Sequence, residues 1–136
     1  MSDTIDGRLA ALGISLPEAA APAANYGPYV ISGNLLFLSG QLPIEGGKVA
    51  VTGLVGGDVA LAEAQRAAEL CAINILAQAQ AALGDLGRIR RVVKITVLVS
   101  STPDFYEHHL VANGASNLLA NILGDAGKHA RAAVGM

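Results

Sequence analysis

Apolar residues in the first half of the chain follow the two-residue period of extended strands. Residues 29–32 (YVIS) and 35–38 (LLFL) form two short runs around a turn-capable glycine-asparagine pair, which predicts a hairpin. A second turn is expected at residues 46–47, followed by a short strand at residues 49–51. Because residues 35–38 are apolar at every position, both faces of that strand should be covered.

Two later segments carry the pattern of helices. The first is expected to run from Asp58, as its N-cap, to Gly84, as its C-terminal stop, with no glycine or proline between them. Small and apolar residues recur along it at steps of three and four, so one face can lie close to a sheet. The second helix is expected to begin at Thr102 as N-cap, with Pro103 in its first turn, and to end near Leu123.

The segment between these helices predicts the strongest strand of the chain. In residues 91–100 (RVVKITVLVS) every second residue from Val93 to Val99 is β-branched and is expected in the core. A last strand is expected to start within residues 129–136 (HARAAVGM). The resulting order, β-β-β-α-β-α-β, predicts an α+β fold in which two helices pack on one face of a mixed sheet. The other face of the sheet would then need a cover.

Composition agrees with a single domain that associates with copies of itself. The 136 residues are 52% hydrophobic and 15% charged, and their mean hydropathy is +0.47. No apolar run reaches the roughly 18 residues that would indicate a membrane span, so we expect the surplus apolar surface in an oligomer interface.

The acidic N-terminal residues do not resemble an export signal, and the single cysteine, Cys71, cannot form an internal disulfide. We expect a cytoplasmic protein. Its net charge of −2 disfavours a nucleic-acid partner.

Six segments of the chain occur in the order that they have in one protein family. They are APAANYGPYV, LFLSGQLP, AQRAAELCAINILAQAQAAL, RVVKITVLV, Phe105 and ARAAVGM. From about residue 21 onward the sequence resembles the Rid family of reactive intermediate deaminases, also called YjgF-like or endoribonuclease L-PSP. Residues 1–20, which include a short predicted helix, would be an N-terminal extension of the single domain, residues 1–136.

The resemblance implies a chorismate-mutase-like fold and a homotrimer with ligand clefts between the subunits. It implies hydrolysis of enamine or imine acids of the 2-aminoacrylate type to 2-oxo acids and ammonia, without a cofactor or a metal. Arg131 stands at the position of the family's key arginine, where a guanidinium can hold a substrate carboxylate through two parallel hydrogen bonds. Water can then attack the imine carbon beside the held carboxylate.

The resemblance also implies further residues of the cleft. Tyr29 would line it, or would equally pack at a subunit boundary, while Ser39 and Gly40 would supply a hydroxyl and an approachable backbone. Asn113 is the candidate for a cleft asparagine, at a longer spacing than in the family. Ala133 stands where many members have cysteine, and alanine suffices there if the position acts through its backbone amide but not if the thiol takes part. Family members continue into a strand whose glutamate orients the attacking water, and we expect the natural chain to continue in this way past Met136.

Several polar patterns leave alternatives open. His108 and His109 are adjacent, so on a helix their side chains diverge by about 100°, and no set of carboxylates accompanies them as metal ligands. His129 precedes Arg131 by two residues and is either a neighbour in the cleft or a structural histidine. Deaminase activity ranks first among the functions. A non-catalytic trimer that binds small carboxylates through Arg131 ranks second, and a ribonuclease third because the charge balance disfavours RNA.

Overall fold

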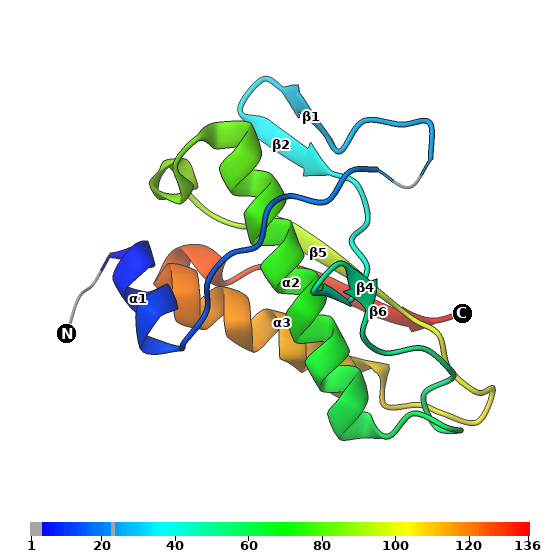
Figure 1. Cartoon of the computed structure of the whole chain (residues 1–136). Helices are drawn as coiled ribbons and strands as arrows, with labels where there is room; N and C mark the ends of the chain where they lie inside the picture. The colour runs from blue at the N-terminus through cyan, green and yellow to red at the C-terminus, as the bar shows by residue number, and fades with distance from the viewer. Residues whose placement is uncertain (1–3, 23) are drawn as a thin grey trace.

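The computed structural model describes residues 4–22 and 24–136 and contains two long helices beside short pairs of strands (Figure 1). Its helices are α1 (Ile5–Ala11), α2 (Leu61–Leu83) and α3 (His108–Leu123), with short 3-10 turns at Leu86–Arg88 and Gly124–Gly127. Its strands are β1 (Tyr29–Ser32), β2 (Leu35–Leu38), β3 (Ile44–Glu45), β4 (Lys48–Val49), β5 (Lys94–Val99) and β6 (Ala130–Gly135). The predicted α+β class and the order of the main elements are therefore confirmed. Strand β3, the partner of the short predicted strand, is an addition.

The strands pair two by two. The β1–β2 and β3–β4 hairpins are antiparallel, whereas β5 and β6 run parallel, with Ile95 opposite Arg131. Among the described residues the strands form three two-stranded sheets and not one continuous mixed sheet. Strands β2 and β5 contribute Leu36, Leu38, Ile95 and Val97 to the same core, but no ladder of hydrogen bonds joins the two strands.

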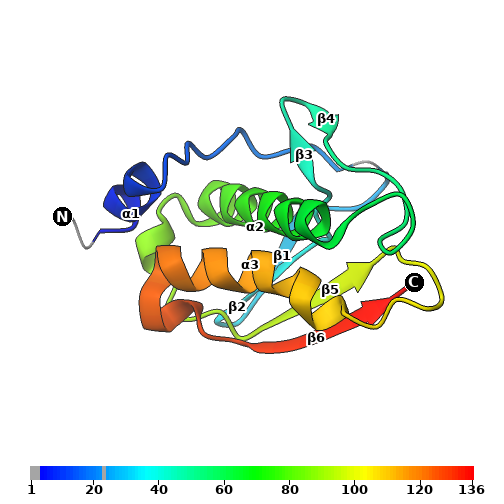
Figure 2. The same ribbon diagram turned by 90° about the horizontal axis from the view of Figure 1, so that it is seen from below.

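Helices α2 and α3 lie side by side over the strand pairs β1–β2 and β5–β6 (Figure 2). Their close approach depends on Gly114 of α3, because a Cβ at this position would collide with the backbone carbonyl of Gln65 in α2. Around this crossing the side chains of Leu76, Leu119 and Ile122 are fully buried. The small residues of the helices thus allow the backbones to approach, and larger aliphatic residues fill the core beside the contact.

The helices begin later than the sequence predicts. The carboxylate of Asp58 accepts a hydrogen bond from the amide of Leu54 (2.9 Å) and thereby stabilises the turn before the helix. The N-cap of α2 is Ala60. Glu107 is the N-cap of α3, while the hydroxyl of Thr102 lies 3.5 Å from the carbonyl of Val55 across a loop. Both predicted caps are wrong, because Asp58 closes a local turn with Leu54 and Thr102 faces Val55 of another loop.

The ends of the helices and the strong strand agree better with the sequence. Helix α2 ends at Leu83 before Gly84, which has a φ of 81°, and α3 ends at Leu123 as predicted. In β5 the alternate residues Ile95 and Val97 are half-buried against the core and Val99 is buried. Val93, however, precedes the strand and is exposed, so it is not a core residue. No helix in the described ranges is long and apolar enough to cross a membrane.

Candidate functional site

Arg131 lies on β6, at the edge of the parallel pair, and its guanidinium group extends along α3. Nη1 donates hydrogen bonds to Asn113 Oδ1 (2.9 Å) and Ser116 Oγ (3.1 Å), and Nη2 donates to the carbonyl of His109 (3.2 Å). A guanidinium has five N–H donors, and within the described ranges the remaining two, one on Nε and one on Nη2, have no acceptor. Arg131 is exposed, so these two donors are available to a ligand.

One face of α3 supplies all three acceptors. His109, Asn113 and Ser116 follow one another at steps of four and three residues, which places them on the same side of a helix. In parallel pairing Arg131 lies on the same face of its strand as its partner Ile95, which packs on the core beneath the helices. The register of β6 therefore directs Arg131 toward α3.

His129 forms a second set of contacts beside Arg131. Its Nδ1 lies 2.6 Å from the carbonyl of Gly127, and its Nε2 lies 2.8 Å from Ser116 Oγ. Because a carbonyl only accepts hydrogen bonds, Nδ1 must carry the proton, and we assign the neutral tautomer whose Nε2 is an acceptor. Ser116 then donates its hydroxyl proton to His129. The sequence left open whether His129 is a neighbour of the site, and the structure places it there.

A hollow of about 300 Å³ lies over this group. Six of its lining residues are Ser116, Asn117, Ala120, Lys128, His129 and Arg131. No carboxylate is among the lining residues, and the nearest acidic partner, Asp125, forms an exposed ion pair with Lys128 (3.2 Å). The local charge is therefore positive although the whole chain is negative, which favours a small anionic ligand.

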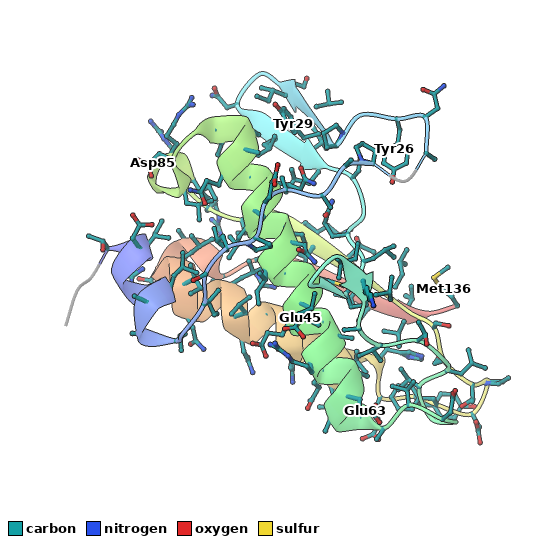
Figure 3. All side chains as sticks on the ribbon, in the orientation of Figure 1. Tyr26, Tyr29, Glu45, Glu63, Asp85 and Met136 are labelled. Carbon is teal, nitrogen blue, oxygen red and sulfur yellow. The ribbon has the colours of Figure 1, made fainter. Side chains whose placement is uncertain are left out.

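The predicted cleft residues divide into two groups within one chain. Asn113 lies beside Arg131, and Ala133 follows two positions along β6 on the same face, opposite Val97 of β5. Tyr29 pairs with Leu38 in the β1–β2 hairpin, which lies apart from β6 and the nearby Met136 in Figure 3.

Ser39 and Gly40 directly follow β2, and so they also belong to the hairpin. Ser39 Oγ donates to the carbonyl of Gly27 (2.6 Å). Among the described residues no hydrogen bond joins Tyr29, Ser39 or Gly40 to Arg131.

Ser116 is a member of the site that the sequence analysis missed. Its signal was the helical spacing from Asn113, which was already a candidate, because a residue three positions later lies on the same helix face. The other histidines do not gather with it. His108 contacts Ser101 Oγ through Nε2 (3.0 Å) and packs edge-on against Phe105, at the start of α3.

Two other kinds of reactive site, a metal centre and a thiolate, have no support in the described part of the chain. No group of three or more histidine, cysteine, aspartate or glutamate side chains there is arranged to hold a metal ion. Burial raises the pKa of the Cys71 thiol from 9.0 to about 11. This thiol therefore stays protonated at neutral pH and is a poor nucleophile. A larger hollow of about 460 Å³, bordered by α1 and Gln80, contains only Asp6 as an ionisable residue.

Comparison with known proteins gives a consistent result. Residues 6–135 match the sequence model of a family described as "YjgF/chorismate_mutase-like, putative endoribonuclease". The chain is 50% identical over 141 residues to Protein TCP17 of Trypanosoma cruzi, across 100% of this chain and 88% of that protein. It is 36% identical over 101 residues to the RutC family protein y4sK of Sinorhizobium fredii (strain NBRC 101917 / NGR234), across 74% of this chain and 71% of that one.

Two crystal structures have the same fold. The protein Atu1372 of Agrobacterium tumefaciens, described as of unknown function, has a TM-score of 0.91 and 65% identity, over 99% of this chain and 83% of that chain. A protein of Shewanella oneidensis MR-1, described as a "putative endoribonuclease", has a TM-score of 0.96 and 37% identity, over 98% of this chain and 89% of that chain. At these identities and coverages the similarity extends to the whole described fold.

Proposed function

Because this chain belongs to the YjgF/chorismate-mutase-like family, we propose that it hydrolyses reactive enamine or imine acids of the 2-aminoacrylate type. The products would be 2-oxo acids and ammonia. Membership by itself supports a Rid-type or endoribonuclease-like role. The observation that supports deaminase activity in particular is the hydrogen bonding of Arg131. Three acceptors hold its guanidinium in place, and two of its N–H donors remain open.

A substrate carboxylate fits the open side of this guanidinium. Hydrogen bonds between two charged groups contribute about 1.5–3 kcal/mol each, and two from one planar group also fix the orientation of the carboxylate. The hollow beside Arg131 contains Lys128 and no acidic side chain, so it does not repel an anion. In such a complex the imine carbon lies next to the held carboxylate, where one positioned water suffices for attack.

We further propose that copies of the chain assemble as a homotrimer with a cleft at each subunit boundary. The supporting observation is the strand face turned away from the helices, which exposes Val30 (63%), Phe37 (56%), Leu98 (60%) and Val134 (48%). Apolar residues concentrated on one face are typical of an interface. In such a trimer the β1–β2 residues Tyr29, Ser39 and Gly40 would complete the cleft of a neighbouring subunit.

A non-catalytic carboxylate binder is the second candidate. The observation that favours it is that Arg131 is already oriented by α3 before any ligand is present, so binding requires no further group. Turnover, by contrast, requires an acceptor for the proton of the attacking water. The two candidates therefore predict the same dependence of binding on Arg131 and differ in whether ammonia is released.

The test measures ammonia release from 2-aminoacrylate that a second enzyme generates in the same solution. The protein should accelerate release above the spontaneous rate, and Arg131→Ala should reduce kcat/KM about 100-fold or more, from the loss of two charged hydrogen bonds. Arg90→Ala, which removes an exposed arginine with no partner in the described structure, is the matched control and should keep full activity.

Calorimetry with pyruvate separates the two candidates. Pyruvate binding that depends on Arg131, together with no acceleration of ammonia release by the natural protein, would establish the binder and reject the deaminase. Binding and acceleration that both depend on Arg131 would establish the deaminase.

A further inference from the structure

We propose that Ser116 and His129 form a proton-accepting pair beside Arg131, which activates the water that attacks the imine carbon. This inference rests on the proposed deaminase function and names the groups that perform its proton transfer. Its basis is the chain of contacts from the carbonyl of Gly127 to His129, from His129 to Ser116, and from Ser116 to the guanidinium of Arg131.

The assigned tautomer of His129 gives each hydrogen bond in this chain a direction. The carbonyl of Gly127 can only accept, so it holds the proton on Nδ1 of His129. A guanidinium can only donate, so Arg131 donates to Ser116 Oγ. In the neutral tautomer assigned to His129, Nε2 can only accept, so Ser116 donates its proton to Nε2. The pair is arranged to move a proton from the serine hydroxyl to the imidazole.

The Ser116 hydroxyl retains room for a water molecule. A hydroxyl oxygen has two acceptor positions, and Arg131 occupies one of them. In the described structure the second has no partner, and Ser116 lines the hollow in which the ligand would lie. A water in the hollow can donate to this oxygen while the substrate carboxylate occupies the open donors of Arg131. The same arginine thus borders both the carboxylate and the water.

The position of His129 depends on a tightly packed turn. A Cβ on Gly127 would collide with the backbone carbonyl of Leu119, so the turn between α3 and β6 is seated directly on the helix. This packing fixes the Gly127 carbonyl, which in turn fixes the ring of His129 and its proton on Nδ1. An imidazole whose tautomer is set by a backbone carbonyl is ready to accept at its other nitrogen.

The proposed reaction is R–C(=NH₂⁺)–COO⁻ + H₂O → R–CO–COO⁻ + NH₄⁺. The water oxygen bonds to the imine carbon, and the C=N π electrons move to nitrogen. The water proton passes to Ser116 Oγ as the serine proton passes to His129 Nε2, which regenerates the hydroxyl and leaves an imidazolium. His129 returns the proton through the same path to the amine nitrogen. The C–N bond then breaks as the carbonyl forms, and the proton lost from the hydroxyl leaves with ammonia as ammonium.

Few charges surround the imidazole that takes up this proton. On its own segment they are Lys128, which is paired with Asp125, and Arg131. From α3 the facing residues are Ser116 and Asn117, which carry no charge, and from the loop before β5 the guanidinium of Arg91 lies at the Lys128 carbonyl. Because Nε2 must accept the proton, catalysis through this pair requires the neutral imidazole.

The experiment compares His129→Gln and Ser116→Ala with the wild-type protein. His129→Gln keeps an acceptor for Ser116 but cannot take up a proton, so kcat should fall about 100-fold, the lower range for loss of a general base. Pyruvate binding should stay within about twofold, because Arg131 is retained. In His129→Gln, the decline of the rate toward acid pH should disappear when the catalysed rate is divided by the spontaneous rate at each pH. Ser116→Ala should show the same loss of kcat.

The matched control is His108→Gln, which alters a second serine-histidine contact among the described residues, outside the hollow. It should retain the wild-type kcat and pH profile. Wild-type kcat and an unchanged acid limb in folded His129→Gln would overturn the inference while leaving the deaminase proposal intact. Absence of any acceleration by the wild-type protein would instead overturn the deaminase proposal. Circular dichroism and melting temperatures establish that each variant folds.

Discussion

At the scale of single residues, the chemistry of the site depends on how neutral groups position one cation. Arg131 has no acidic partner among the described residues, and amide, hydroxyl and carbonyl oxygens hold its guanidinium. A carboxylate in their place would hold the side chain more strongly but would also neutralise it. The sequence could indicate Arg131 and Asn113 through the family resemblance. It did not by itself indicate Ser116, because the helical spacing of this serine from Asn113 gains meaning only when Asn113 is placed beside Arg131.

A charge at Asn113 should therefore impair the site. In Asn113→Asp the new carboxylate would lie at the position from which Oδ1 now accepts from Arg131 at 2.9 Å, and it would compete with the ligand for the guanidinium. We expect pyruvate to bind at least about tenfold more weakly, an effect near 1.4 kcal/mol. Calorimetry at fixed ionic strength measures this change.

Asn121→Asp provides the comparison, since it adds the same charge at an exposed position of α3 outside the hollow. It should change the pyruvate affinity by less than about twofold, because exposed charges at a distance are screened by salt. Equal effects of the two substitutions would show that only the total charge of the protein matters, and would contradict the local role of Asn113.

At the scale of elements, the sequence located the helices and the strong strand better than their first residues. Helix ends and the turns between strands depend on glycines that act locally, and these positions were predicted well. Asp58 and Thr102 looked like capping residues, but their side chains are used by Leu54 and Val55 across loops. An aspartate can close a local turn as readily as it can cap a helix, and the Thr102–Val55 contact joins residues that are distant in sequence, so the predicted helix starts are wrong.

The α2–α3 contact is the element whose disruption should be most costly. Gly114→Ala places a methyl group against the backbone of Gln65, where no flexible side chain can yield. Overpacking of this kind costs about 1–3 kcal/mol, and we expect the free energy of unfolding to fall by at least that amount. Urea denaturation followed by circular dichroism measures it.

Gly40→Ala is the matched control, because a Cβ at Gly40 meets no atom within 4 Å. Its free energy of unfolding should change by no more than about 0.5 kcal/mol. If Gly114→Ala were equally harmless, the two helices would not be packed as closely as described.

At the scale of the whole molecule, the predicted cleft residues fall into two separate groups within one chain. Tyr29, Ser39 and Gly40 lie with the β1–β2 hairpin, while Arg131, Asn113 and Ala133 lie with β6 and α3. The sequence predicts an apolar strand face that the helices do not cover, and exposed residues of β1, β2, β5 and β6 form such a face. How copies would meet across it depends on contacts between chains, which a pattern within one chain does not specify.

Light scattering tests this assembly. The protein should have about three times the 13.8 kDa mass of one chain, and Leu98→Asp should reduce the measured mass by placing a charge on the apolar face. Tyr106→Asp introduces the same charge at a residue that is 78% exposed in the loop before α3, and it should leave the mass unchanged. A monomeric wild-type protein at micromolar concentration would contradict the trimer.

The most direct measurement is the kcat/KM for ammonia release from 2-aminoacrylate in the wild-type protein, Arg131→Lys and Arg131→Ala. If the planar guanidinium binds the carboxylate, the wild-type protein should accelerate release. Arg131→Lys should then recover only a small part of the activity lost in Arg131→Ala, because an ammonium keeps the charge but not the two parallel donors. Full activity in Arg131→Ala would contradict the proposed role of this arginine, and full activity in Arg131→Lys would show that its charge alone is sufficient.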